Sequence, residues 1–211
     1  MLHYHIEGGY ENHQQLVFSP NTATQFNQLT HDRLDTPMEP YPLKKVEIPS
    51  ADLGNRGLLF AGIGWYTRLE FPYLNNIMEH GEYVHIEKAG LKIYPEYGTY
   101  SDFNALPDSI FLYIADENNV VTDAVKDYLG KQVQGGKLVK DDLFLGNTYY
   151  YFDVTQFMKE ELGASGKYKH NLQLVFNSDD YTKTLKNLTF SAPNGQNPII
   201  LQLNYKIYES Y

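Results

Sequence analysis

The sequence predicts an all-β protein, a jelly-roll-like antiparallel β-sandwich with one short helix. The composition includes 19 tyrosines and 11 phenylalanines in 211 residues, and aromatic residues favour the pleated, half-buried surface of a strand. About ten short segments alternate apolar and polar residues with a period of two, and turn residues separate them. Helical periodicity is almost missing from the chain. Together these observations are typical of a sandwich or jelly roll.

The first 57 residues are expected to form a hairpin remnant followed by a long crossing segment. Residues 2–6 and 13–18 alternate like strands around Gly8 and Gly9. Residues 19–57 contain Pro20, Pro37, Pro40, Pro42 and Pro49. Proline lacks a backbone donor, so this stretch interrupts sheet pairing. We therefore divide the chain into residues 1–57 and a sandwich domain over residues 58–211.

Residues 2–6 and 203–207 share the pattern L-x-Y-x-I. We interpret the first copy as the closing strand of a preceding domain. A lone hairpin is marginally stable in water, and an unpaired apolar edge tends to pair. We therefore expect residues 2–18 to add to a sheet edge, either within the chain or across a dimer.

From residue 58 onward the strand pattern continues to the end of the chain. The predicted strands cover residues 59–63, 65–71, 84–86 with 89–94, 109–115, 142–145, 149–154, 172–176, 188–190 and 199–208. The one predicted helix covers residues 155–162, where Val154, Phe157, Met158 and Leu162 have helical spacing and Gly163 follows as a stop signal. At this length the chain buries ~70% of its unfolded surface, so stability requires no metal or disulfide.

Charge and composition exclude several classes of partner. The formal net charge is −9, and the longest basic run is Lys44-Lys45. Nucleic acids and anionic membranes both require a clustered positive surface, so we expect neither as a partner. The chain has no cysteine, so it has neither a disulfide framework nor a thiol site. No apolar stretch approaches ~18 residues, so we expect no membrane insertion. If the protein is exported, its signal lies outside this numbering.

The sequence contains no recognisable catalytic constellation, and we expect a protein that is not an enzyme. Adjacent acidic pairs such as Asp141-Asp142 point to opposite faces of a strand, which is unsuitable for paired acid and base catalysis. His3, His5 and His13 have a spacing that suits a metal, and an ordinary exposed strand face is the favoured alternative. Residues 116–119 and 177–180 are rich in oxygen ligands for calcium, but polar turns are favoured there. We therefore predict no metal and no cofactor.

Clusters of aromatic residues are the best indication of a binding site. Tyr97, Tyr100 and Phe103 follow closely after Tyr94, and residues 149–151 are three consecutive tyrosines. Exposed tyrosines stack on sugar rings or anchor a protein interface. We predict Tyr97, Tyr100 and Phe103 as the ligand-binding residues. The alternative is that tyrosine simply fills the rims of the sandwich.

Several segments resemble a known group of proteins. These are residues 86–94 (IEKAGLKIY), 151–157 (YFDVTQF) and 198–205 (PIILQLNY), in an order similar to that of carbohydrate-binding-module-like jelly rolls. With residues 26–32 and 60–74, the chain resembles a family of exported Bacteroidetes lipoproteins classed as a domain of unknown function. The resemblance covers most of the chain.

The resemblance implies two consecutive β-sandwich halves behind a lipoprotein signal, of which this chain matches the second half and the closing strand of the first. It also implies export to the periplasm, the outer membrane or the cell surface through a lipid anchor. The family's anchor cysteine has no counterpart in this chain. The family contributes no catalytic residues.

These observations predict a non-catalytic cell-surface or periplasmic module that binds a glycan or another ligand. The alternative is a structural module in a cell-surface protein complex, with another surface protein as partner. A hydrolase is a third option, and it requires two converging carboxylates in a cleft. The sequence leaves the ligand and the oligomeric state open.

Overall fold

The computed structural model describes residues 21, 28, 30, 32–42, 46–80, 83–126, 129–141, 147–163, 170–191 and 197–208. The chain divides into two compact units, Met1–Asp32 and Arg33–Tyr211. The predicted strands over residues 2–6 and 13–18, with His3, His5 and His13, lie outside the described residues, as does the predicted strand over residues 142–145. All elements named below belong to the second unit.

The second unit consists mainly of strands. They are β1 (Arg56–Phe60), β2 (Thr67–Leu69), β3 (Tyr83–Ile93), β4 (Ser109–Ala115), β5 (Val121–Ala124), β6 (Gly135–Val139), β7 (Tyr149–Asp153), β8 (Asn171–Val175), β9 (Asn187–Ser191) and β10 (Ile200–Tyr208). The α-helices are α1 (Thr155–Gly163) and α2 (Ser178–Lys183), and short 3-10 helices cover Ser50–Leu53, Ala61–Ile63 and Leu74–His80. Every pairing between these strands is antiparallel, which confirms the predicted fold class.

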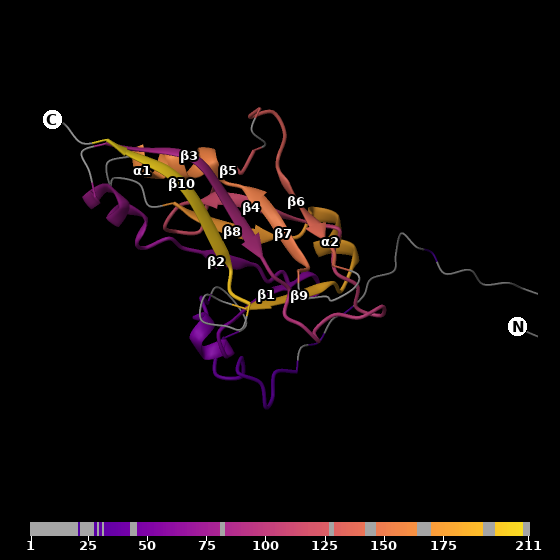
Figure 1. Cartoon of the computed structure of the whole chain (residues 1–211). Coiled ribbons are helices and arrows are strands. Elements are labelled where there is room, and N and C mark those ends of the chain that lie inside the picture. Colours follow the sequence, from indigo (N-terminus) through magenta and orange to yellow (C-terminus); the bar gives the residue numbers. More distant parts are fainter. Residues whose placement is uncertain are drawn as a thin grey trace, which may run out of the picture. The chain divides into compact units, whose positions relative to one another are not determined.

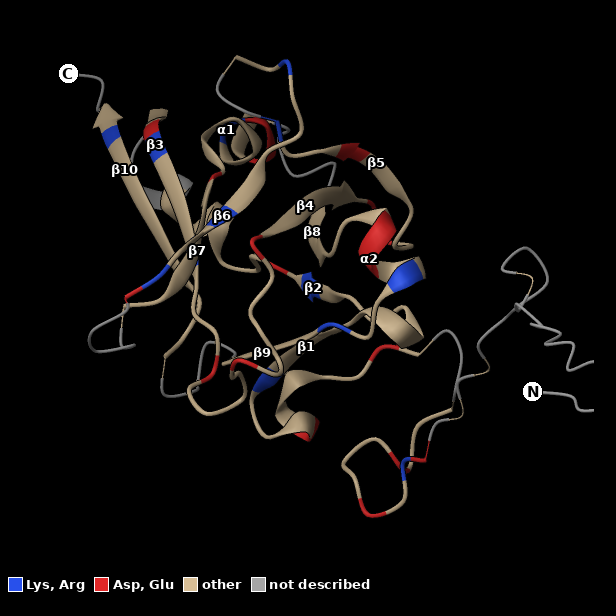
Figure 2. Ribbon diagram, turned by 90° about the vertical axis from the view of Figure 1, so that its right-hand side faces the viewer, with Lys and Arg blue, Asp and Glu red and all other residues tan. Residues whose placement is uncertain are grey.

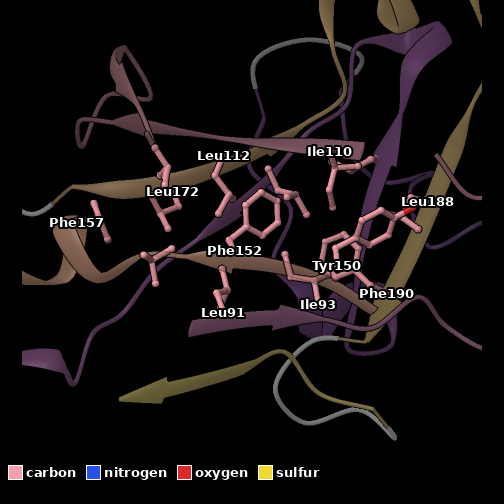
Figure 3. Packing of buried hydrophobic residues seen from close by; sticks show 14 of the residues in the cluster. Leu91, Ile93, Ile110, Leu112, Tyr150, Phe152, Phe157, Leu172, Leu188 and Phe190 are labelled. Atoms are coloured by element: carbon pink, nitrogen blue, oxygen red, sulfur yellow. The ribbon is translucent and has the colours of Figure 1, made fainter. Parts of the chain in front are cut away.

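The strands form two sheets. In the larger sheet the order is β10-β3-β7-β6-β4-β8-β2, with β5 paired to β4, and the smaller sheet is the pair β1 and β9 (Figure 1). The core lies between two parts of the larger sheet, because side chains of β3 and β7 meet side chains of β4 and β8 (Figure 3). Leu91 and Phe152 from the first part and Leu112 and Leu172 from the second are fully buried. This is the layered packing expected of a sandwich.

The strand β6 connects the two parts of the larger sheet. It pairs with β7 on one side and with β4 on the other. At Gly136, a Cβ atom would lie only 2.2 Å from Cζ of Phe152, so the ring of Phe152 occupies the space above the glycine. A glycine in a strand commonly marks such a close approach or a tight bend. The sequence did not predict β6, because consecutive glycines usually indicate a turn.

The predicted helix over residues 155–162 is confirmed as α1. The carboxylate of Asp153 accepts a hydrogen bond from the backbone N–H of Thr155 at 3.0 Å, and the hydroxyl of Thr155 accepts one from the backbone N–H of Ala89 at 2.8 Å. These bonds hold the start of the helix against β3. Phe157 and Met158 are buried in the core on the inner face of the helix.

The structure adds a second short helix, α2, that the sequence did not predict. The side-chain oxygen of Asn177 accepts a hydrogen bond from the backbone N–H of Asp180 at 2.7 Å, which is a standard N-terminal cap. Six residues are too few for helical periodicity to show in the sequence. In the part of the chain that the structure describes, no helix has the length and apolar character needed to cross a membrane.

Candidate functional site

The candidate site lies on the outward face of the four neighbouring strands β10, β3, β7 and β6. Side chains alternate between the two faces of a strand. Because Tyr150 and Phe152 of β7 point into the core, Tyr149 and Tyr151 point outward. On β3, Lys92 lies between the buried residues Leu91 and Ile93 and points outward in the same way.

Strand register aligns the outward side chains into rows across the sheet. Tyr151 lies opposite Lys92 of β3 on one side and opposite Lys137 of β6 on the other. Lys88 of β3 lies opposite Asn204 of β10. The pairing therefore brings polar and aromatic residues from distant parts of the sequence onto one surface.

This surface contains a hollow of ≈ 450 Å³. Its lining residues are Lys88, Gly90, Lys92, Val139, Tyr149, Tyr151, Gln202 and Asn204. Gly90 contributes no side chain, and a Cβ atom built there would lie 3.0 Å from the hydroxyl oxygen of Tyr151. The ring of Tyr151 thus leans over the glycine and forms part of the floor of the hollow.

The ring of Tyr149 has aromatic and cationic neighbours. Its centroid lies 5.6 Å from that of Tyr94, with the two planes tilted by 50°. The ammonium nitrogen of Lys92 lies 5.0 Å from the same centroid, within the range of a cation–π interaction. These contacts restrict the ring before any ligand binds, so less side-chain entropy is lost on binding.

The charge on this face differs from the charge of the whole chain. Among the residues that the structure describes, no carboxylate lines the hollow, although the chain carries 26 acidic and 17 basic residues. Figure 2 shows basic positions on β3, β6 and β10. At one end of the face Lys206 forms an ion pair with Glu87. Asp153 lies opposite Gly90, and Thr155 engages its carboxylate through hydrogen bonds from its backbone N–H and its hydroxyl.

The predicted ligand-binding residues Tyr97, Tyr100 and Phe103 lie in the loop that follows β3. Tyr97 is 71% exposed and Phe103 is fully exposed. Tyr100 instead packs against the core. Burial raises the pKa of its hydroxyl above the usual value, and a hydrogen bond with Thr148 offsets only part of this rise. None of the three lines the hollow on the sheet. Their role in binding stays a prediction.

The three consecutive tyrosines are divided between the core and the surface. Tyr150 is fully buried, and its hydroxyl donates a hydrogen bond to the carbonyl oxygen of Pro107 at 2.6 Å. Burial raises the pKa of this hydroxyl far above its usual value. Tyr149 and Tyr151 therefore supply the aromatic surface of the site. Sequence reasoning named this cluster and missed Lys88, Gln202 and Asn204, which give no local signal.

A second, smaller hollow of ≈ 270 Å³ contains the acidic residues Asp123, Glu160 and Glu161. Glu161 bonds with the ring of His170 at 2.5 Å, and Glu160 accepts a hydrogen bond from the amide of Gln156 at 2.7 Å. The ammonium group of Lys126 lowers the pKa of Asp123. Each carboxylate therefore has a partner within the chain, and Asp123 does not have the raised pKa of a general acid.

The oxygen-rich segments at residues 116–119 and 177–180 act within their own turns. The carboxylate of Asp116 accepts hydrogen bonds from the backbone N–H groups of Asn118 and Val120, at 2.9 and 2.8 Å. Asn177 caps α2, and Asp180 forms an ion pair with Lys186. Over the described ranges, no three or more His, Asp or Glu side chains gather in a way that could hold a metal ion.

Comparisons of the sequence with models of known protein families and with curated proteins find no match.

Proposed function

We propose that this chain is a non-catalytic glycan-binding module that holds a polysaccharide on the outward face of β10, β3, β7 and β6. The observation that carries the proposal is the hollow formed by Tyr149, Tyr151 and the polar side chains around them. Tyrosine rings offer an apolar surface to the C–H groups of a sugar ring, and the phenolic hydroxyl adds a hydrogen bond.

The polar lining suits the hydroxyl groups of a sugar. The amides of Gln202 and Asn204 each provide donors and an acceptor, and both residues are exposed. The lack of a side chain at Gly90 lets the ring of Tyr151 lie close to the sheet as part of the floor of the hollow. Because these residues lie on strands, the backbone holds their relative positions more rigidly than a loop does.

The same proposal includes the location expected from the sequence. A surface or periplasmic module of an exported lipoprotein meets polysaccharides directly, and the resemblance of residues 86–94, 151–157 and 198–205 to carbohydrate-binding jelly rolls supports this reading. A direct check is to express the full gene product and determine whether a labelled lipid is attached.

The experiment tests binding to a polysaccharide panel by affinity electrophoresis and calorimetry. We expect Tyr151→Ala to weaken binding by ~1 to 2 kcal/mol, the loss of one stacking contact. Tyr73→Ala is the matched control, because Tyr73 is highly exposed and does not line the hollow. A thermal melt of each variant checks that the fold is retained.

A parallel set of variants tests the loop predicted from the sequence. Tyr100→Ala is expected to weaken binding by ~1 to 2 kcal/mol if Tyr97, Tyr100 and Phe103 form the platform. Because Tyr100 packs against the core, Tyr97→Ala and Phe103→Ala are the cleaner variants. Loss of binding in these two with normal binding by Tyr151→Ala would place the site on the loop. No binding across the panel would favour the alternative role.

The alternative role is a structural module that assembles through β10. This strand is at the end of the sheet order and pairs only with β3 among the described strands. Its side chains Tyr205 and Ile207 are 42% and 39% exposed, and Tyr208 contacts Tyr83 with ring centroids 5.9 Å apart. An exposed edge with apolar side chains favours pairing with another strand. Light scattering of the wild type and of Ile207→Lys tests this role. The role requires that the wild type forms an oligomer and that Ile207→Lys weakens it.

A further inference from the structure

We infer that the polysaccharide bound on the sheet face is anionic, with carboxylate or sulfate groups on its sugar rings. This inference rests on the proposed function and adds the chemical class of the ligand. The observation behind it is the presence of lysines on this face, because stacking on a neutral sugar does not require cationic side chains.

Three lysines lie on this face, at positions 88, 92 and 137. Lys88 and Lys92 line the hollow, and Lys137 follows from the register because it lies opposite Tyr151. Within the described part of the chain, none of the three forms an ion pair. No described carboxylate therefore neutralises their charges, in a chain whose net charge is −9.

The lysines surround the aromatic platform. Lys92 and Lys137 flank Tyr151 in one row across three strands, which places their Cα atoms about 10 Å apart given the usual strand spacing. Lys88 lies four residues before Lys92 on β3, about 13 Å away along the strand. A sugar stacked on Tyr151 thus has ammonium groups on both sides of its ring.

The contact between Lys92 and Tyr149 holds one of these charges in place. The ring face attracts the ammonium group at 5.0 Å without neutralising it. The group therefore remains able to donate a charge-assisted hydrogen bond to an anionic ligand, and such bonds are stronger than bonds between neutral groups.

The short length of the positive surface favours an acidic glycan over a nucleic acid. Glu87 directly precedes Lys88 on β3, and Asp153 lies opposite Gly90, between the positions of Lys88 and Lys92, so acidic residues interrupt the positive region and keep it small. Nucleic acid binding generally depends on many phosphate contacts, on the order of 6 to 10 for a typical site. Three lysines in an acidic chain provide too few. A sugar chain with one anionic group on a ring requires no more than the lysines around Tyr151.

The test measures binding of the intact chain to polygalacturonate, dextran sulfate, neutral dextran and a thymidine oligonucleotide, by calorimetry at low and at high salt. We expect an anionic polysaccharide to bind, and to bind at least tenfold more weakly when salt screens the charges. Lys92→Gln and Lys88→Gln are each expected to reduce its affinity roughly tenfold. Lys159→Gln, an exposed change on α1 with the same effect on net charge, is the control and is expected to bind like the wild type.

The outcomes separate this inference from the proposed function. Preference for polygalacturonate identifies carboxylate as the recognised group, and preference for dextran sulfate identifies sulfate; both support the inference. If neutral dextran binds through Tyr151 and the lysine variants have no effect, the inference is wrong and the proposed function still holds. Binding of the oligonucleotide with the same lysine dependence, or equal effects of Lys92→Gln and Lys159→Gln, also overturns the inference. Failure of every polysaccharide removes both proposals.

Discussion

Substitution of Gly136 is the sharpest test of how the larger sheet closes around its core. Gly136 lies on β6 opposite Ile110, where the sheet passes from β7 to β4. A Cβ atom there would lie 2.2, 2.5 and 2.7 Å from three ring atoms of Phe152. Since carbon atoms pack at about 3.5 to 4.0 Å, the ring would have to retreat by more than 1 Å.

The core offers little room for that movement, because Phe152 is fully buried. Overpacking of a core typically costs about 1 to 3 kcal/mol, and complete loss of a buried phenylalanine ring costs about 3 to 5 kcal/mol. We therefore expect Gly136→Ala to lower the free energy of unfolding by about 2 to 4 kcal/mol. For a domain of this size the melting temperature would fall by on the order of 10 °C.

The neighbouring residue provides a matched control. A Cβ atom at Gly135 would lie 3.5 Å from Cε1 of Phe111, which is ordinary van der Waals contact. Gly135→Ala is therefore expected to be neutral or to stabilise the protein by up to about 1 kcal/mol, because it removes the backbone freedom of a glycine.

Urea denaturation followed by circular dichroism and by fluorescence of the single tryptophan measures both variants. The double variant Gly136→Ala with Phe152→Leu is expected to lose less stability than the sum of its single changes, because the smaller side chain leaves space for the new methyl group. If Gly136→Ala and Gly135→Ala unfold within about 0.5 kcal/mol of each other, the reasoning is refuted.

Three further predictions concern the core and the edge of the domain. Phe157→Ala is expected to destabilise the protein by about 3 to 5 kcal/mol, because it removes a buried ring from α1; an unchanged denaturation midpoint would contradict this. Burial raises the pKa of Tyr181 to about 12, so the contribution of this hydroxyl to stability should be constant below pH 10 and fall between pH 10 and 12, where only the unfolded state loses this proton. Tyr181→Phe should make the midpoint less dependent on pH in that interval, and an identical slope would show that Tyr181 does not contribute. Deletion of residues 1–18, which carry the predicted edge strand, is expected to change the mass in light scattering or the melting temperature, and no change in either would show that the segment adds to no sheet edge.

Much of the local structure could be predicted from the sequence. The alternation of Tyr149, Tyr150 and Tyr151 requires that the middle ring and the outer two face opposite sides, and the structure buries only the middle one. The apolar spacing of Phe157 and Met158 predicted α1 in the same way. These features follow from the periods of 2 and 3.6 residues, which depend only on neighbours along the chain.

The candidate site depended on the tertiary structure. Lys88 lies opposite Asn204, and Lys92 and Lys137 lie on either side of Tyr151. These arrangements arise only through pairings between strands that are far apart in the sequence. No local pattern specifies which strands become neighbours, or their register, because both depend on how distant segments bury their apolar faces together. The Gly135-Gly136 pair shows the same limit. Its sequence is typical of a turn, and only the three-dimensional structure shows that Gly136 lies on a strand under the ring of Phe152. Period two therefore determined which way each side chain points, and long-range packing alone decided which side chains meet.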